Sequence, residues 1–380
     1  MVNFHFKTAT SAGSVEPITK AAPAGKEQVY SNVPGVAPGA AEQYQQYILP
    51  MVSRTFGLTI PQLPGSLRRV IANAYLLARA ADTLEDEKTL DKDRKYYYGE
   101  ALMEIVAGRG DVDRFAGELA LLLSPGTSQA ERNLIRNLPL IIHITRTFTT
   151  SQQQAIERCI RIMWKGMHCF LDKRSRYGLA TRQEMEDYCY YVAGVVGEML
   201  TALFSEYCPA IAAKQEEMRK LSVSFGHALQ IVNILKDQWE DRQAGTCWLP
   251  RDLFALHGVR LEQLEPGNTT EGYRAALLEL VGMAHAHLRN AFRYTLLIPA
   301  SEPGIRRFCY WAIALAALTL RNITRRPDFT AAAAIKVRRR KVAQLIALTR
   351  FTGVSNWVLK QHFRLITTNL PLRETALSAI

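Results

Sequence analysis

Apolar residues recur at steps of three and four along most of this chain, and that spacing restricts it to a helical fold. In residues 67–81 the recurring positions are Leu67, Val70, Ile71, Ala74, Ala78 and Ala81. Similar spacing occurs in residues 91–107, 128–146, 151–172, 182–206, 215–240, 271–298, 305–323 and 332–350. No run shows the alternation that is typical of a strand. We therefore predict an all-α bundle of about a dozen helices around a central cavity.

The composition divides the chain into one long domain and two short ends. Residues 1–42 are rich in Ala, Gly, Pro and Ser, which predicts a flexible leader, and they lack the apolar core of a secretory signal. No change of composition marks a second domain between residues 43 and 365. We predict a single helical domain there, followed by a polar tail at residues 366–380.

The net charge of +12 indicates an anionic partner, which is a nucleic acid, a membrane surface or a polyanionic small substrate. The densest basic run, residues 336–341, carries no nucleic-acid-binding motif, so we expect no nucleic-acid partner. The chain contains no stretch of 18 consecutive apolar residues, so no transmembrane anchor is predicted. Its six cysteines form no C-x-x-C pair. We expect a cytoplasmic protein with peripheral association with an anionic membrane. Its oligomeric state stays open, and a monomer is compatible with the sequence.

Two helical stretches end in paired aspartates. Tyr75, Arg79, Asp82 and Asp86 are spaced four, three and four, so they share one stripe of a helix. A second stripe has the same design and consists of Gln230, Asn233, Asp237 and Asp241. Like charges at a helix C-terminus are unfavourable by a few tenths of a kcal/mol. A solvated acidic helix end explains one such stretch, but two matching stretches favour a Mg²⁺ site that holds a diphosphate.

The two stretches resemble the paired aspartate-rich motifs of the squalene/phytoene synthase family. "DTLED" at 82–86 is similar to the first motif, and "NILKDQWEDRQAG" at 233–245, with Trp248, Leu249 and Pro250, to the second. "SRTF" (53–56), "FLDK" (170–173) and "DYCYYVAGVVGEMLTALF" (187–204) resemble other family segments. "FCYWAIALAALTL" (308–320) and "IKVRRR" (335–340) resemble late segments of the squalene-forming members in particular.

The resemblance implies a role for each residue of these motifs. Mg²⁺ would be held by Asp82, Asp86, Asp237 and Asp241, with Glu85 as an auxiliary ligand. The diphosphate of farnesyl diphosphate would be bound by Ser53, Arg54, Arg79, Gln230 and Lys236. For the arginines, an ordinary salt bridge to nearby acids is the alternative interpretation, and both can hold for Arg79.

Aromatic side chains would surround the carbocation that forms when the diphosphate leaves. The resemblance assigns Tyr188 to the first half-reaction and Phe308 to the second, and Tyr75 is a further catalytic candidate. Simple core packing is the alternative for each ring. Gly194 and Gly197 predict a close helix contact or room for a prenyl chain.

NADPH is the second cofactor that the resemblance implies. No G-x-G-x-x-G fingerprint is present. The resemblance points instead to Asn233, Lys336 and Arg338. The alternatives for the basic residues are a solvated helix end and a membrane-facing patch.

The resemblance implies a prenyltransferase that joins two farnesyl diphosphates head to head through presqualene diphosphate and reduces the intermediate to squalene with NADPH. A non-reducing synthase that forms dehydrosqualene or phytoene is the alternative, and a non-catalytic basic membrane-binding protein is a second. Two departures from the family pattern concern the diphosphate contacts: Lys236 and Thr246 stand where arginines are expected.

Overall fold

The computed structural model describes residues 39–267, 269–352, 355–374 and 378. This part of the chain is helical without any strand, apart from one isolated bridge between Leu179 and Pro250. The all-α prediction is therefore confirmed. The predicted leader lies almost entirely outside the described residues, and the described chain is already helical at Ala40.

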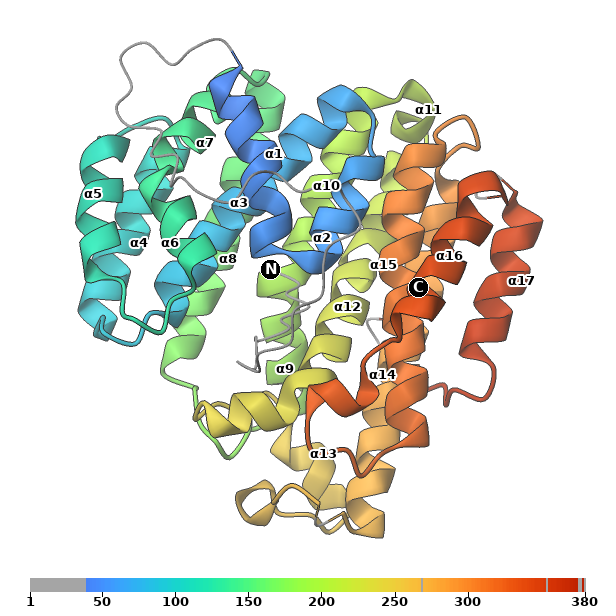
Figure 1. Ribbon diagram of the computed structural model, residues 1–380. Coiled ribbons are helices and arrows are strands. Elements are labelled where there is room, and N and C mark those ends of the chain that lie inside the picture. Colours follow the sequence, from blue (N-terminus) through green and yellow to red (C-terminus); the bar gives the residue numbers. More distant parts are fainter. Residues whose placement is uncertain (1–38, 268, 353–354, 375–377, 379–380) are drawn as a thin grey trace.

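Figure 1 shows the order of the elements. The first half contains α1 (Ala40–Val52), α2 (Arg54–Thr59), η1 (Ile60–Gln62), α3 (Gly65–Asp86), α4 (Lys92–Val106), α5 (Val112–Leu122), α6 (Gln129–Arg136), α7 (Leu138–Thr145), α8 (Thr150–Leu171), α9 (Arg182–Cys189) and η2 (Tyr190–Gly194). The second half contains α10 (Val195–Tyr207), α11 (Pro209–Ala212), α12 (Gln215–Gln243), α13 (Arg251–Leu256), η3 (Leu261–Gln263), α14 (Glu271–Leu297), α15 (Pro303–Arg325), η4 (Ala332–Ile335), α16 (Arg339–Thr352) and α17 (Asn356–Thr367).

The described residues form seventeen α-helices rather than about a dozen, partly because two predicted segments are interrupted. The predicted segment 128–146 divides at Asn137, where Pro139 enters the first turn of α7. The predicted segment 182–206 contains a π-helical turn, η2, between α9 and α10. Such turns insert one residue into a helix and are frequent at functional sites.

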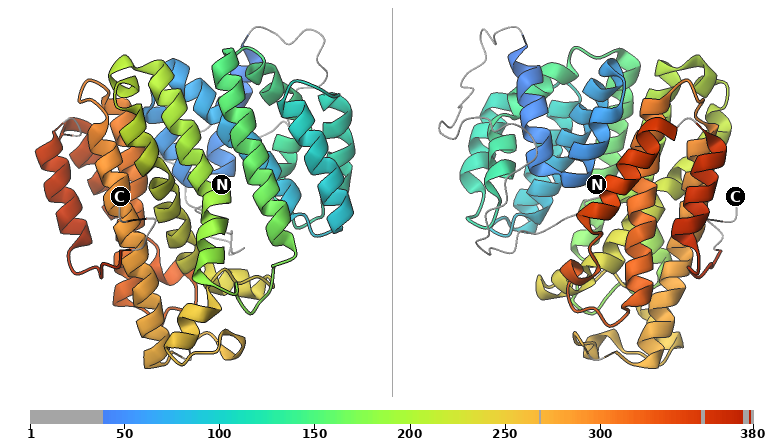
Figure 2. Two further views of the ribbon diagram at one scale, coloured as in Figure 1. Left: turned by 180° about the vertical axis from the view of Figure 1, so that it is seen from behind. Right: turned by 45° about the vertical axis from the view of Figure 1, so that its right-hand side comes forward.

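Helix α12 forms the centre of the bundle and packs against α10, α14 and α15. Helix α3 packs against α8, and α8 in turn packs against α10, so these helices connect α3 to the central helix (Figure 2). Helices α4 and α5 lie at one edge of the molecule, and α16 and α17 lie at the opposite edge (Figure 1). The two acid-bearing helices are thus held in place by layers on both sides.

Close helix contacts depend on glycine. A Cβ atom on Gly197 of α10 would lie 2.0 Å from the backbone oxygen of Ser222, and one on Gly226 of α12 would lie 2.2 Å from that of Ala193. Real Cβ atoms do not approach so closely, so any larger residue would force the helices apart. This confirms the close contact predicted from Gly197.

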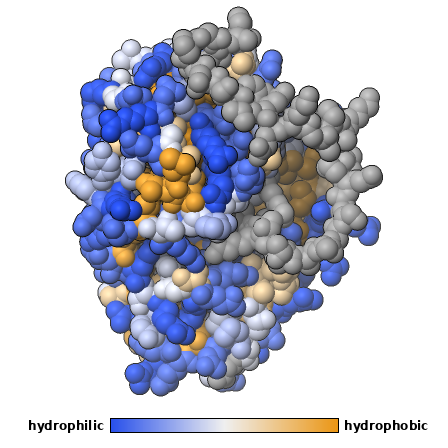
Figure 3. All heavy atoms as spheres, turned by 60° about the vertical axis from the view of Figure 1, so that its left-hand side comes forward, coloured by the Kyte–Doolittle hydropathy of each residue, from blue (hydrophilic) through white to orange (hydrophobic). Residues whose placement is uncertain are grey.

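The face shown in Figure 3 is mainly hydrophilic where its residues are coloured and carries a smaller hydrophobic patch. Among the helices described, none combines the length and the hydropathy that crossing a bilayer requires. Pro371, which follows α17, lies against α14, where His285 Nδ1 donates to Pro371 O at 2.8 Å.

Candidate active site

The first acidic stretch lies at the C-terminal end of α3, where the backbone becomes extended at Glu87. Asp82 and Glu85 are buried, whereas the Asp86 side chain is 60% exposed. Burial disfavours the charged form of a carboxyl group and raises the pKa of Asp82. The pKa of Glu85 rises to about 8, mainly through burial and further through the nearby Asp86 and Asp82. Such crowding of carboxyl groups favours a cation beside them.

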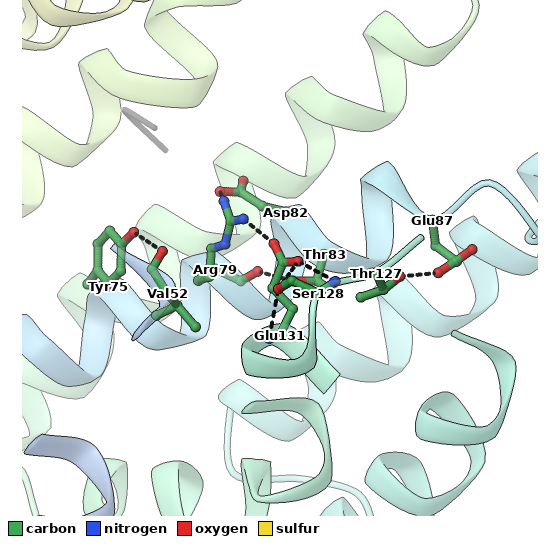
Figure 4. Close-up of polar contacts among 9 residues, drawn as sticks. All are labelled: Val52, Tyr75, Arg79, Asp82, Thr83, Glu87, Thr127, Ser128 and Glu131. Carbon is green, nitrogen blue, oxygen red and sulfur yellow. Dashed lines mark hydrogen bonds and ion pairs between the residues drawn. The ribbon is translucent and has the colours of Figure 1, made fainter. Parts of the chain in front are cut away.

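Arg79 lies one turn before Asp82 and forms an ion pair with Glu131 of α6 (Figure 4). Its Nη1 atom is 3.8 Å from Asp82 Oδ2. Ser128 fixes Glu131 by donating to its Oε2 atom from the backbone N at 3.1 Å and from Oγ at 2.6 Å. Burial acts to lower the pKa of Arg79, but Glu131 and Asp82 outweigh it and raise that pKa. The predicted salt bridge to nearby acids is present, and the guanidinium stays charged beside Asp82.

Arg174 is a site residue that the sequence did not reveal. It lies in the loop after α8, forms an ion pair with Glu85, and places Nη2 3.6 Å from Asp86 Oδ1. Lys95 of α4 donates to the backbone oxygen of Glu85 at 2.5 Å. No periodic pattern marks Arg174, because its loop reaches the end of α3 only through the tertiary fold. No pattern marks Glu131 either, because α6 also reaches α3 only through the tertiary fold.

The second acidic stretch lies near the C-terminal end of α12. Gln230, Asn233 and Lys236 are buried, and the Asp237 side chain is 14% exposed. Lys236 Nζ lies 3.0 Å from Asp237 Oδ2 and 3.5 Å from Asn233 Oδ1. Within the described part of the chain, Gln230 Oε1 and Asn233 Nδ2 are buried without a hydrogen-bond partner. A buried polar atom without a partner is costly, so these atoms are suited to receive a ligand.

Tyr188 connects the two acidic stretches. Burial raises the pKa of Tyr188 well above its ordinary value, and the nearby carboxylates of Glu85, Asp241 and Asp86 raise it further, against the opposing effect of Arg174. Glu85 and Asp86 belong to α3, whereas Asp241 belongs to α12. Both acid-bearing helix ends therefore lie close enough to the Tyr188 hydroxyl to act on its charge.

An aromatic cluster of Phe170, Tyr188 and Trp248 lies at this meeting point. The rings of Tyr188 and Trp248 stack at 3.9 Å between centroids and 8° between planes. The Phe170 ring is 5.3 Å from that of Tyr188. Aromatic faces attract positive charge, so the cluster suits a cation that develops beside the acidic stretches.

The remaining aromatic candidates are packed in the core. Tyr75 is buried against Phe56 with ring centroids 5.1 Å apart, and its hydroxyl donates to Val52 O at 3.4 Å. Burial raises the pKa of Tyr75 to about 12. Phe308 is buried, with its ring 6.2 Å from and nearly perpendicular to that of Phe204. Tyr75 shares α3 with Arg79 and Asp82, whereas the ring of Phe308 lies beside Phe204 of α10.

The N-terminal "SRTF" segment forms the start of α2. Ser53 caps this helix by accepting from Phe56 N at 3.0 Å. Its hydroxyl also contacts Tyr75, where it acts to lower the phenol pKa against the larger effect of burial. The side chain of Arg54 lies outside the described residues.

Comparison with known proteins agrees with this geometry. A profile described as squalene/phytoene synthase matches residues 49–343. The chain belongs to the squalene/phytoene synthase family. A squalene synthase of Schizosaccharomyces pombe is 26% identical over 305 residues, which are 79% of this chain and 63% of that protein. The chain thus matches less than two thirds of the length of that relative.

Solved structures of the family share the fold. The complex of TcSQS with the ligand BPH1237 has a TM-score of 0.66 at 20% identity and covers 89% of this chain and 94% of its own. A dehydrosqualene synthase in complex with a ligand has a TM-score of 0.56 at 23% identity, with coverages of 82% and 95%. These likenesses confirm the isoprenoid-synthase type of helical bundle.

The segment that precedes the basic residues linked to NADPH by the family resemblance lies next to α12. Ala332 N donates to Glu240 Oε1 at 2.8 Å, and Trp239 Nε1 donates to Phe329 O at 2.6 Å. These bonds fix η4 and the segment before it to the part of α12 that carries Asp237 and Asp241. Lys336 follows η4 directly, and Lys336 and Arg338 are both exposed.

The acidic side chains are the candidate ligands of a metal ion. Within the described residues, no three or more His, Cys, Asp or Glu side chains gather closely enough to hold a metal ion by themselves. Mg²⁺ commonly keeps several waters and is bound through one or two carboxylates and the substrate phosphates. Burial raises the pKa of Asp82 and Glu85, and a cation beside these crowded carboxyl groups would favour their charged forms. The metal role of these residues stays a prediction.

Proposed function

We propose that this family member joins two farnesyl diphosphates head to head through presqualene diphosphate and reduces the intermediate to squalene with NADPH. The proposal rests on the stacked rings of Tyr188 and Trp248, together with the acidic ends of α3 and α12, whose carboxylates both raise the pKa of Tyr188. A diphosphate at the acidic stretches would place its prenyl carbon beside the aromatic cluster. That arrangement suits the ionisation of an allylic diphosphate.

The polar half of the site would bind the leaving group. Bound Mg²⁺, held by Asp82, Asp86, Asp237 and Asp241 with Glu85 as an auxiliary ligand, would neutralise the charge that develops on the diphosphate. Arg79 and Arg54 would bind its oxygens as planar forks. Lys236 offers a point charge, and Ser53 and Gln230 complete the predicted diphosphate contacts.

The apolar half would protect and direct the carbocation. The stacked rings of Tyr188 and Trp248 offer π faces to positive charge and exclude water. The raised pKa keeps the Tyr188 phenol protonated. In the first half-reaction it would relay a proton, giving its own to a diphosphate oxygen while it accepts one from the carbocation. Tyr75 and Phe308 would line the path of the prenyl chains.

The reductive half is assigned to the side of α12 that faces η4. Exposed Lys336 and Arg338 offer cations for the phosphates of NADPH. The buried Asn233 amide nitrogen, which lacks a partner in the described part of the chain, offers a donor. These residues match NADPH in charge and in hydrogen bonding, and they would bind and orient it.

Product analysis tests the proposal. The purified protein is incubated with farnesyl diphosphate and Mg²⁺, with and without NADPH, and the extracted hydrocarbon is identified by mass spectrometry. We expect squalene only in the presence of NADPH. Dehydrosqualene with or without NADPH would remove the reductive half, and phytoene from geranylgeranyl diphosphate would change the substrate. No product from either substrate would overturn the proposal.

Carboxamide variants test the acidic stretches. Asp82→Asn and Asp237→Asn each keep the side-chain shape and remove one charge, and we expect product formation to fall by about 10²-fold or more. Asp113→Asn is the matched control, since Asp113 is an exposed carboxylate in the first turn of α5. Equal activity in all three variants would exclude the predicted role of the aspartates.

A further inference from the structure

One long stretch of the chain is basic and contains no acid. Residues 329–373 include nine lysines and arginines and not one aspartate or glutamate. They supply most of the net charge of +12. This stretch includes η4, α16 and α17, and the two long helices lie side by side on the outside of α15 (Figure 2). The excess of positive over negative charge is therefore concentrated in this stretch, most of whose helical residues belong to α16 and α17.

The outer face of α17 combines these charges with large apolar side chains. Trp357, Gln361 and Leu365 follow one another at four-residue steps and form a stripe. Trp357 is 68% exposed and Leu365 is 64% exposed. Lys360 and Arg364 are exposed beside this stripe. Two large apolar side chains with cations alongside are unusual on a helix that faces only water.

The inner face of α17 is firmly attached to the bundle, so its outer face has a fixed direction. The ring of Phe363 stacks on Phe292 at 4.3 Å and 8°. Tyr310 Oη lies 2.7 Å from His362 Nδ1. Arg306, buried in α15, donates to Asn356 Oδ1 at the first residue of α17. Trp357 is therefore held outward by contacts on the opposite side of its own helix.

Helix α16 carries a second group of cations. Arg339, Arg340 and Lys341 occupy its first turn and are exposed. Cations at a helix N-terminus oppose the helix dipole, so this placement weakens the helix slightly. Thr349 anchors the opposite side of α16 by accepting from Trp311 Nε1 at 2.7 Å. Among the described residues, none of these three cations has a carboxylate partner. Their charge is thus available to an external anion.

We propose that the outer face of α16 and α17 is a docking surface for an anionic lipid bilayer. Trp357 and Leu365 would enter the interfacial region, where tryptophan is favoured, while Lys360, Arg364 and the first turn of α16 contact lipid phosphates. Each cation near an anionic membrane contributes about 1 kcal/mol. Exposed leucine in the same stripe favours lipid over nucleic acid, because a base stacks on aromatic rings and gains nothing comparable from leucine. The first turn of α16 directly follows Arg338, which the proposed function assigns to NADPH, so the variants that test the surface are confined to α17.

Vesicle co-sedimentation of the full chain tests this surface. The probes are vesicles of phosphatidylcholine alone and vesicles with about one third phosphatidylglycerol, at low and at physiological salt. We expect binding only to the anionic vesicles, weakened by salt. Lys360→Glu with Arg364→Glu removes two cations, so we expect binding to fall by about thirtyfold or more. Trp357→Ser with Leu365→Ser should weaken the binding that remains at physiological salt.

Matched variants separate this surface from net charge and from surface apolarity in general. Lys220→Glu with Arg274→Glu makes the same change of net charge at exposed positions elsewhere, and Leu121→Ser with Leu256→Ser removes exposed leucines elsewhere. Both should bind as the parent does. Equal losses in the controls, binding that ignores lipid charge, or binding to a single-stranded RNA but not to vesicles would overturn the proposal. Thermal unfolding of each variant verifies that it is folded.

Discussion

The guanidinium of Arg174 forms an ion pair with the Glu85 carboxylate and thereby joins the loop after α8 to the C-terminal end of α3. The Glu85 side chain is 11% exposed and the Arg174 side chain 25% exposed. Glu85 already has a raised pKa in the presence of this arginine. The loop thus supplies positive charge to the most crowded carboxyl group of the site.

Removing that charge should destabilise the protein. We expect Arg174→Gln to lower the free energy of unfolding by about 1–3 kcal/mol at neutral pH, because Glu85 loses a charged hydrogen-bond partner. Arg176→Gln, an exposed position in the same loop, should change it by less than about 0.5 kcal/mol. Urea unfolding measures both. In the double variant Arg174→Gln, Glu85→Gln, part of the loss should be recovered. Equal stability of the two single variants would contradict the role of this pair.

The hydroxyl of Tyr188 should matter more than its ring. Tyr188→Phe keeps the stack on Trp248 and removes the hydroxyl of the proposed proton relay, so we expect kcat for farnesyl diphosphate to fall by about 10²-fold while KM stays within about twofold. Tyr191→Phe is the control, since Tyr191 also lies beside Phe170, with ring centroids 6.4 Å apart. Steady-state kinetics with labelled farnesyl diphosphate measures the split. An unchanged kcat in Tyr188→Phe would assign the residue to packing alone.

Periodicity predicted the long helices because their apolar stripes report directly on burial. The segments at 91–107, 151–172 and 271–298 correspond to α4, α8 and α14 within a residue or two at each end. The acidic stripes on α3 and α12 were predicted for the same reason. The approach of both stripes to Tyr188 required the fold, since no local pattern states which helix ends face each other.

The sequence did not predict the breaks within helices or the side-chain partners that are distant in the chain. The π-helical turn η2 lies within the segment 182–206, which the periodicity predicts as one continuous helix. Its packing depends on Gly226 of α12, whose backbone lies against Ala193. The basic run at 336–341 was included in a helix over 332–350, but α16 begins only at Arg339. Arg174 and Glu131 reach α3 from distant loops and helices, so spacing carries no signal for them.

Two Gly→Ala substitutions should change stability in opposite directions. Gly226→Ala would place a Cβ 2.2 Å from the Ala193 backbone oxygen, so we expect a loss of about 1–3 kcal/mol in the free energy of unfolding. Gly117→Ala in α5 meets no atom within 4 Å and restricts the unfolded chain, so we expect a gain of about 0.5–1 kcal/mol. Urea unfolding of both variants measures the difference. A stabilised Gly226→Ala would show that α12 and η2 are not in close contact.

His287 should make the protein sensitive to mild acid. It is fully buried, its Nδ1 lies 2.7 Å from Ser224 Oγ, and burial lowers its pKa from 6.5 to about 3. Below pH 6.5 the unfolded chain binds a proton at this position that the folded chain does not bind, so stability falls as the pH falls. Between pH 7.5 and pH 5 this histidine alone should cost about 2 kcal/mol.

The variant His287→Gln keeps a polar side chain but does not titrate, and every other titrating group is common to both proteins. Urea unfolding at pH 7.5 and pH 5 should therefore show that the parent loses about 2 kcal/mol more than the variant. His143→Gln, at an exposed position, should lose as much as the parent. An equal loss of unfolding free energy in the parent and in His287→Gln would show that the buried histidine is protonated in the folded state. That result would require a hydrogen-bond or charge partner for the imidazolium.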